Sequence, residues 1–166
     1  ELSSQVINGR TISELLLEMT GKTGEKVELP DYKAMEAETM AAYNHLGNKL
    51  ATIVGFNMKG EKIETTAHEI ALQIAAMNPL ALDSSSIPQA AIDHELEIAR
   101  DMIRQEGKPE EMVEKIAQGK LNKFLKENTL LNQDYIDNNK LSVGDYIKQV
   151  DAKLACTGFF RLQVGA

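Results

Sequence analysis

The spacing of apolar residues first predicts two helices at the start of the chain. Residues 1–7 have the pattern of the middle of a helix, and Asn8-Gly9 is suited to end it because glycine tolerates left-handed backbone geometry. Thr11 begins a second helix, with Glu14 three residues later as the second half of a capping box. Thr20-Gly21 is expected to end this helix. The opening lacks a capping residue, so we expect a piece of a longer chain.

Alternating polar and apolar residues then predict strands. Residues 26–29 alternate as a half-buried strand does, and extended structure is expected again over residues 32–38. Gly47-Asn48 has the composition of a turn between two strands. Residues 50–57, rich in Ile, Val, Thr and Phe, give the clearest strand. Residues 159–164 also alternate, and we expect this late strand to pair with residues 50–57.

Helical spacing returns in the middle of the chain. Residues 64–77 form one predicted helix, which Pro79 ends, and Ser142 is the expected cap of a short helix. Between them, residues 87–127 predict two long helices joined by a turn at Gly107-Lys108-Pro109, as in an antiparallel hairpin. Apolar residues recur there at steps of three and four, and the expected hairpin core is Ile92, Leu96, Ile103, Val113, Ile116, Leu121 and Phe124. The predicted fold is therefore α+β, a small antiparallel sheet packed with helices and carrying an inserted helical hairpin.

Charge and composition exclude several classes of protein. The formal net charge of −7 argues against a nucleic-acid-binding protein, which needs clustered Lys and Arg. No apolar run approaches the ~20 residues that cross a membrane as a helix. Cys156 is the single cysteine, so no internal disulfide can form, as is usual in the cytoplasm. Because no basic residue flanks it, a buried thiol is favoured over a reactive one.

Motifs of enzyme chemistry fail when their full spacing is tested. Gly21-Lys22-Thr23 matches the end of a phosphate-binding loop, but Leu16 stands where that loop requires a glycine. His68 and His94 each precede a glutamate, yet neither is followed by the second histidine of a zinc-protease helix. We expect no metal, no cofactor and no bond chemistry, and therefore a protein that binds a partner rather than an enzyme.

Seven segments, taken in order, resemble those of one protein family. They are residues 22–25, 43–45, 71–79, 106–116, 119–124, 130–133 and 158–165. Together they resemble the core of elongation factor Ts. The resemblance implies that residues 1–39 are the C-terminal part of a first core subdomain. It also implies that residues 40–84 and 129–166 form a second α+β subdomain, and that residues 85–128 are the coiled-coil arm inserted into it.

The resemblance implies a function in protein synthesis. Members of the family bind the GTPase elongation factor Tu in the cytoplasm and promote release of its GDP, without changing a covalent bond. The family's N-terminal helical module and its Thr-Asp-Phe-Val segment have no counterpart in these residues. In the family, the Asp and Phe of that segment intrude near the partner's magnesium site, so we expect binding with weakened exchange.

Partner-binding residues follow from the matched positions. The resemblance implies that His45 approaches the partner's phosphate-binding loop, with Tyr43 and Asn44 shaping its presentation. Thr23 and Gly24 would lie against a helix of the GTPase domain, with Lys22 and Glu25 nearby. From the residues alone, an ordinary turn histidine is the favoured interpretation of His45, and a simple helix-to-strand turn that of Thr23-Gly24. With the resemblance, a partner contact is favoured for His45.

The predicted hairpin leaves two interpretations open. In some members of the family this arm mediates self-association, which would make the chain a homodimer. The alternative is a self-contained helix pair that buries its apolar stripe internally. A structural dimerisation module without exchange activity is therefore the alternative function.

Overall fold

The computed structural model describes residues 2–165, which form two compact units with a boundary between Met35 and Glu36. The first unit begins with a short 3-10 helix, η1 (Leu2–Ser4), and a two-stranded hairpin of β1 (Val6–Ile7) and β2 (Arg10–Thr11). The helix predicted over residues 1–7 is therefore wrong. Asn8 and Gly9 have φ values of 52° and 80°, which suit a tight hairpin turn rather than the end of a helix.

Helix α1 (Ile12–Thr23) begins as predicted and ends later than predicted. The Thr11 hydroxyl accepts from the Glu14 amide, and the Glu14 carboxylate accepts from the Thr11 amide at 2.7 Å. The predicted stop at Thr20-Gly21 is wrong, because Gly21 keeps helical geometry and only Gly24 takes a left-handed φ of 72°. A glycine inside a helix weakens it without ending it.

The strand predicted over residues 26–29 is also wrong. In the described part of the chain these residues pair with no other strand, and the Val27 amide instead donates to the Thr20 hydroxyl at 3.0 Å. Residues 32–38 likewise form no strand. Alternation describes a strand only where a neighbouring strand can take its hydrogen bonds. None of residues 2–35 is buried.

The second unit contains a three-stranded antiparallel sheet in the order β3-β4-β7. Its strands are β3 (Thr39–Asn44), β4 (Leu50–Phe56) and β7 (Cys156–Gln163). The predictions of a turn at Gly47-Asn48 and of the strand over residues 50–57 are confirmed. So is the pairing of the late strand, since Ile53 lies opposite Phe160 in the ladder.

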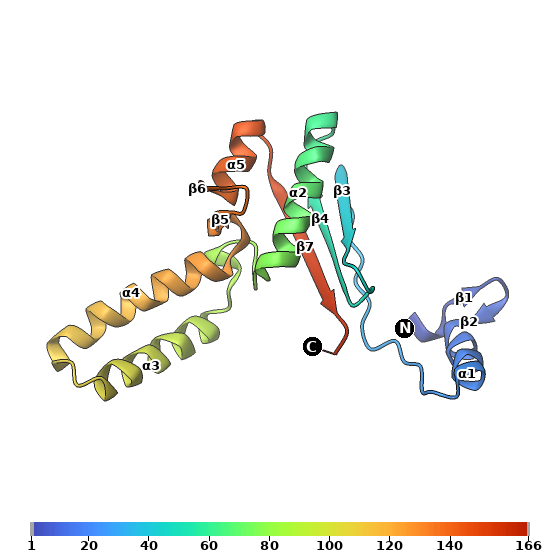
Figure 1. Cartoon of the computed structure of the whole chain (residues 1–166), viewed down its shortest axis with the longest axis horizontal. Helices are drawn as coiled ribbons and strands as arrows, with labels where there is room; N and C mark the ends of the chain where they lie inside the picture. The colour runs from blue at the N-terminus through green and yellow to red at the C-terminus, as the bar shows by residue number, and fades with distance from the viewer. Residues whose placement is uncertain (1, 166) are drawn as a thin grey trace. The chain divides into compact units, whose positions relative to one another are not determined.

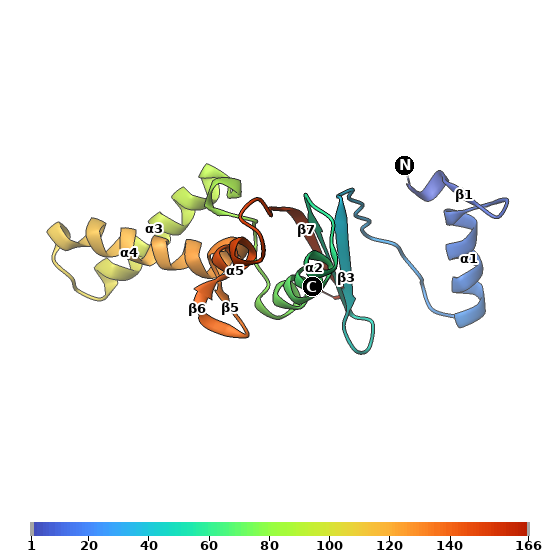
Figure 2. The same cartoon turned by 90° about the horizontal axis from the view of Figure 1, so that it is seen from above.

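Helix α2 (Glu61–Met77) packs along one face of this sheet, as Figures 1 and 2 show. It confirms the helix predicted over residues 64–77 and starts three residues earlier. Val54 and Phe56 on β4 are fully buried against Ile70 and Ile74 of α2. The core of the second unit thus forms where alternate residues of the strand meet the residues that share one face of the helix.

Two antiparallel helices extend from this body side by side (Figures 1 and 2). They follow the short 3-10 helix η2 (Ser84–Ser86) and are α3 (Gln89–Gln105) and α4 (Glu110–Asn128). They confirm the predicted hairpin, with Gly107 at a φ of 73° in the turn. Of the expected core residues, Ile103, Val113 and Leu121 are buried, whereas Ile92, Leu96, Ile116 and Phe124 are half-buried.

Cross-helix ion pairs reinforce the hairpin. Arg100 binds the carboxylate of Glu114 through two hydrogen bonds of 2.8 Å, and Arg104 binds Glu110. These side chains are in contact with solvent, which screens the attraction between the charges and leaves each pair only a small contribution to stability. The buried apolar residues therefore supply most of the contact between α3 and α4.

The tail contains a strand pair that the sequence analysis did not predict, followed by a helix that it did. After η3 (Leu130–Asn132), two short strands, β5 (Asp134–Tyr135) and β6 (Asn138–Ser142), form a small hairpin. Helix α5 (Val143–Val150) then starts at Ser142, whose hydroxyl accepts from the Asp145 amide as predicted. Tyr135 and Tyr146 stack with ring centroids 4.2 Å apart and link β5 to α5. The chain thus has an α+β fold with a helical hairpin.

Candidate functional site

The turn between β3 and β4 has a tightly determined backbone. The His45 amide donates to Leu50 O at 2.9 Å, and the His45 carbonyl accepts from the Asn48 amide at 3.0 Å. Gly47 and Asn48 have φ values of 86° and 53°, a geometry that glycine and asparagine adopt at least cost. The turn therefore presents its side chains from a closed, hydrogen-bonded loop.

Three of the predicted site residues gather on this turn. The Tyr43 hydroxyl lies 2.8 Å from Nδ1 of His45, and the two rings are tilted at 54°. On the other side, Asn44 Nδ2 donates to Asn48 Oδ1 at 2.7 Å. Tyr43 also packs against the apolar core, whereas His45 is exposed. A side chain anchored in the core thus holds the exposed imidazole.

Leu46 was not anticipated by the sequence analysis. Its side chain is 91% exposed, more than any other large apolar side chain of the described residues. The available signal was an apolar residue directly before a Gly-Asn turn, where polar residues are usual. Leu46 adds an apolar group next to the exposed histidine.

The four remaining predicted residues cluster at the C-terminal end of α1. Lys22 pairs with Glu18, and hydrogen bonds from Lys22 and Arg10 lower the pKa of Glu18 to about 2. The Thr23 hydroxyl lies 2.9 Å from Met19 O, which closes the last turn of the helix. Gly24 then reverses the chain, and its amide donates to Thr20 O.

These four residues form a polar, exposed corner. Glu25 follows Gly24 directly, and its amide is 3.3 Å from the Thr23 hydroxyl. The corner contains no pair of side chains arranged as nucleophile and base. Its backbone is ordered by helix-end hydrogen bonds, so it is suited to contact a surface rather than to carry out a reaction.

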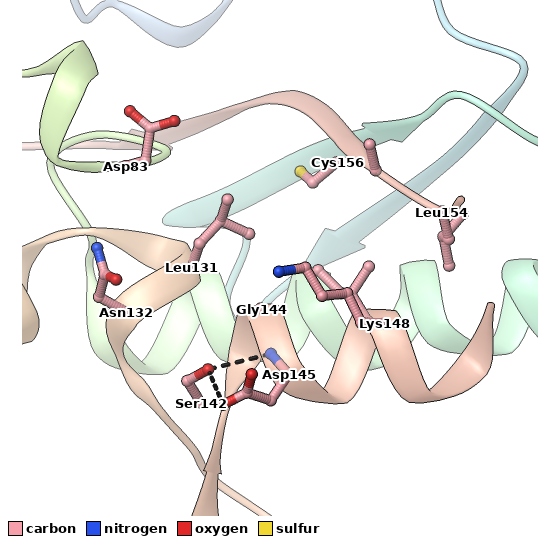
Figure 3. A pocket seen from close by; sticks show the side chains of 11 residues that line it. Asp83, Leu131, Asn132, Ser142, Gly144, Asp145, Lys148, Leu154 and Cys156 are labelled. Carbon is pink, nitrogen blue, oxygen red and sulfur yellow. Dashed lines mark hydrogen bonds between the residues drawn. The ribbon is translucent and has the colours of Figure 1, made fainter. Parts of the chain in front are cut away.

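The pocket shown in Figure 3 has a volume of about 380 Å³ and lies between α5, η3 and the start of β7. Burial raises the pKa of the Cys156 thiol to about 11, which makes it a poor nucleophile near neutral pH. The Asp83 carboxylate accepts from the hydroxyls of Ser85 and Ser86, and these bonds lower its pKa. The Asp83 carboxylate therefore caps a local turn, and the side chains that line this pocket make no catalytic pair.

The described residues offer neither a metal site nor a membrane-spanning helix. Within residues 2–165, no three His, Cys, Asp or Glu side chains are grouped so that they could hold a metal ion. His68 and His94 are both exposed, on α2 and α3. In the same part of the chain, no helix combines the length and apolar character needed to span a membrane.

Comparisons with known proteins give one consistent result. The family model described as "Elongation factor TS" matches residues 1–166. The chain is 47% identical over 165 residues to elongation factor Ts of Flavobacterium psychrophilum, which covers 99% of this chain and 60% of that relative. It is 45% identical over 157 residues to elongation factor Ts of Christiangramia forsetii, an alignment that covers 95% of this chain and 57% of the relative. It is 44% identical over 167 residues to elongation factor Ts of Amoebophilus asiaticus, with 100% of this chain and 60% of the relative covered. The chain thus spans about 60% of the length of these relatives.

Proposed function

The chain belongs to the elongation factor Ts family, and from this premise we propose that it binds the GTPase elongation factor Tu and promotes release of GDP during protein synthesis in the cytoplasm. The match of the family model over residues 1–166 is the observation that carries the proposal. The protein would act as an exchange factor and not as an enzyme, because it changes an equilibrium of binding rather than a covalent bond.

Exchange follows from linked binding equilibria. A protein that binds the nucleotide-free GTPase more tightly than the GDP-bound form must, by linkage, lower the affinity of the GTPase for GDP by the same factor. Such coupling free energies are typically about 1–3 kcal/mol, which is roughly 5- to 150-fold in affinity. A preformed surface is favourable for this task, since little binding free energy is then lost in ordering it.

The two surface segments described above are the proposed contacts. His45, with Tyr43 and Asn44, would approach the partner's phosphate-binding loop. The corner formed by Lys22, Thr23, Gly24 and Glu25 would lie against a helix of the GTPase domain. In support, both segments combine exposed side chains with a backbone held by hydrogen bonds.

A nucleotide-release experiment tests the proposal. Elongation factor Tu loaded with a fluorescent GDP analogue is mixed with the protein and excess GDP, and we expect faster loss of fluorescence than without the protein. Titration calorimetry with nucleotide-free partner should give a saturable heat. His45→Ala should weaken that binding about tenfold, the usual effect of losing one well-placed contact. The matched control is His94→Ala, an exposed histidine on α3. Absence of any binding to the nucleotide-free partner would contradict the proposal.

Self-association through the hairpin is the second candidate function. One observation favours it: Ile98 and Met102 are 40% and 50% exposed, and they line a shallow apolar hollow with Leu121 and Phe124. A second hairpin could cover this surface by helix packing.

Sedimentation tests this candidate. A homodimer predicts a mass that rises with protein concentration and falls back to that of the monomer in Met102→Glu. Ile103 and Leu121 are unsuitable positions for this test, because a charge there would disrupt the hairpin itself. A concentration-independent monomer mass would exclude the dimer.

A further inference from the structure

We propose that the β3–β4 turn makes a two-point contact, in which Tyr43 fixes the ring of His45 with its Nε2–H directed outward and Leu46 is an apolar anchor beside it. The inference rests on the proposed function and specifies the chemistry of the surface that the turn contacts. That surface has an apolar pocket wide enough for a leucine side chain, with an oxygen hydrogen-bond acceptor at its rim.

The backbone of the β3–β4 turn is held in one shape. Hydrogen bonds from His45 N to Leu50 O and from Asn48 N to His45 O close the loop on both sides of Leu46. The Asn44–Asn48 side-chain bond of 2.7 Å adds a third closure. Leu46 and His45 are therefore offered from one small loop, so few degrees of freedom have to be frozen when they are bound.

The contact with Tyr43 determines which nitrogen of the neutral His45 ring carries the proton. A neutral imidazole carries one N–H, and the hydrogen bond made by one nitrogen determines which nitrogen carries it. The 2.8 Å contact joins Nδ1 to a phenol hydroxyl, and the phenol is the better donor and the imidazole nitrogen the better acceptor of this pair. Tyr43 therefore donates to Nδ1. The proton of the ring then lies on Nε2, on the side of the ring away from Tyr43.

Tyr43 is itself anchored in the core of the second unit. Its ring packs against the core cluster that includes Val54 and Ile74, so its hydroxyl has a fixed origin. Thr52 lies opposite Tyr43 in the ladder and is itself buried, with its hydroxyl donating to Ala71 O. The orientation of His45 is thus transmitted from α2 and β4 through one phenol, which makes Tyr43 a positioning residue.

Leu46 has an unusual setting for an exposed apolar side chain. A single exposed apolar residue is unremarkable on a surface. Leu46 differs because it is almost fully solvated, sits on a closed turn and is adjacent in sequence to an oriented donor. Complete burial of a leucine in a partner improves affinity about tenfold or more. The neighbouring Nε2–H donor of His45 fixes how the turn is oriented on the partner, because only an acceptor at one side of the partner's pocket can bind it.

The positioning step is tested on the free protein by NMR of the imidazole ¹⁵N nuclei, with His68 and His94 as internal references. At neutral-to-alkaline pH we expect His45 to show protonated Nε2 and unprotonated Nδ1, and Tyr43→Phe to shift the Nδ1 resonance. A ring protonated on Nδ1, or an Nδ1 resonance unchanged in Tyr43→Phe, would overturn the proposal. Circular dichroism melts show whether Tyr43→Phe keeps the fold.

The anchoring step is tested by titrating nucleotide-free elongation factor Tu. Leu46→Ala should weaken binding about tenfold or more, whereas Leu80→Ala, at a leucine that is 64% exposed elsewhere in the same unit, should not. In the His45→Ala background, Tyr43→Phe should have no further effect. If the wild type binds elongation factor Tu but Leu46→Ala and Leu80→Ala bind it with equal affinity, Leu46 is not an anchor.

The two experiments also separate this inference from the proposed function. If the wild-type protein does not bind elongation factor Tu at all, the proposed function fails and the anchor fails with it. The NMR measurement needs no partner, so the relation of Tyr43 to His45 is decided independently.

Discussion

Gln73 and Gln133 face each other in the interior of the second unit, with Nε2 of Gln73 3.3 Å from Oε1 of Gln133. Neither side chain has more than 1% of its surface exposed. Gln133 Nε2 in turn donates to the carbonyls of Met77, at the end of α2, and Glu127, near the end of α4. This buried amide pair therefore ties the base of the hairpin to the helix that covers the sheet.

Replacing the second of these amides should loosen that junction. In Gln133→Leu the carbonyls of Met77 and Glu127 lose a donor inside the protein, and we expect the free energy of unfolding to fall by about 2–4 kcal/mol. Urea unfolding measures the loss, and hydrogen exchange should quicken at residues 127–131. The control Gln149→Leu, at an exposed glutamine of α5, should change stability by about 0.5 kcal/mol or less. Equal effects of the two variants would contradict a role for the buried pair.

Two glycines in helices should respond to alanine in opposite directions. A Cβ on Gly144 of α5 would lie 3.0 Å from Leu131 O, whereas a Cβ on Gly119 of α4 would meet nothing within 4 Å. Gly119→Ala should stabilise the protein by about 0.5–1 kcal/mol, because alanine costs less backbone entropy in a helix. Gly144→Ala should destabilise it by about 1 kcal/mol or more, since α5 has to move away from η3. Thermal melting of both variants checks this, and stabilisation in both would show that the close approach is not restrictive.

Adjacent residues on α3 offer a test of what holds the hairpin together. Ile103 is fully buried between the helices, while its neighbour Met102 is half exposed. Ile103→Ala should cost about 2–4 kcal/mol through the cavity it leaves. Met102→Ala should cost much less. Hydrogen exchange of the α3 and α4 amides reports the loss locally, and similar protection in both variants would argue that the ion pairs, not the apolar contact, hold the helices.

Alkaline pH should destabilise the protein in part through Cys156. Burial raises the pKa of its thiol from 9.0 to about 11, so the folded state favours the neutral form. This stabilising contribution is complete below pH 9 and is lost as the pH rises through 11, with a slope of up to about 1.4 kcal/mol per pH unit. The raised pKa values of Tyr135 and Tyr146 act in the same direction. Both tyrosines are present in Cys156→Ala as well. The difference in stability between the wild type and Cys156→Ala, measured by urea unfolding from pH 8 to pH 11, therefore reports the thiol alone. If the stabilities of the two proteins fell in parallel, the thiol would not contribute to the loss.

The sequence predicted best those elements whose ends depend on local chemistry. Thr11 with Glu14, and Ser142 with Asp145, are caps whose hydrogen bonds lie within four residues, and both helices start where these residues predict. Gly47 and Gly107 likewise mark turns through their own backbone geometry. Such signals need no knowledge of the distant chain.

Short elements that depend on a partner strand were predicted poorly, unlike the longer strands β4 and β7. Residues 26–29 alternate like a strand but find no neighbour in the described chain, and the short hairpin of β5 and β6 has too few residues to show a period. The turn at Asn8-Gly9 carried the composition of a two-residue hairpin, which competed with its interpretation as a helix end. In each case the presence or absence of a neighbouring strand, rather than the residue pattern itself, decided the structure.

The candidate site was predicted in part. Tyr43 and His45 are two residues apart on an extended segment, so their side chains lie on one side of the chain, and this much is visible in the sequence. The hydrogen bond between them and the exposure of Leu46 depend on the closed turn and appear only in three dimensions. The partner-binding roles of these residues, and the division of the chain into two subdomains and an arm, stay predictions.

The stacked pair of Tyr135 and Tyr146 has a practical consequence for optical spectroscopy. The chain contains no tryptophan and four tyrosines, and two of those four lie ring to ring at the junction of β5 and α5. Near-ultraviolet circular dichroism should therefore be dominated by this one rigid aromatic dimer, and its disappearance would report the opening of that junction without any label. Because the protein has no tryptophan, excitation at wavelengths that tyrosine does not absorb gives no fluorescence from it. Tryptophan emission from a binding partner could therefore be followed without a contribution from this protein.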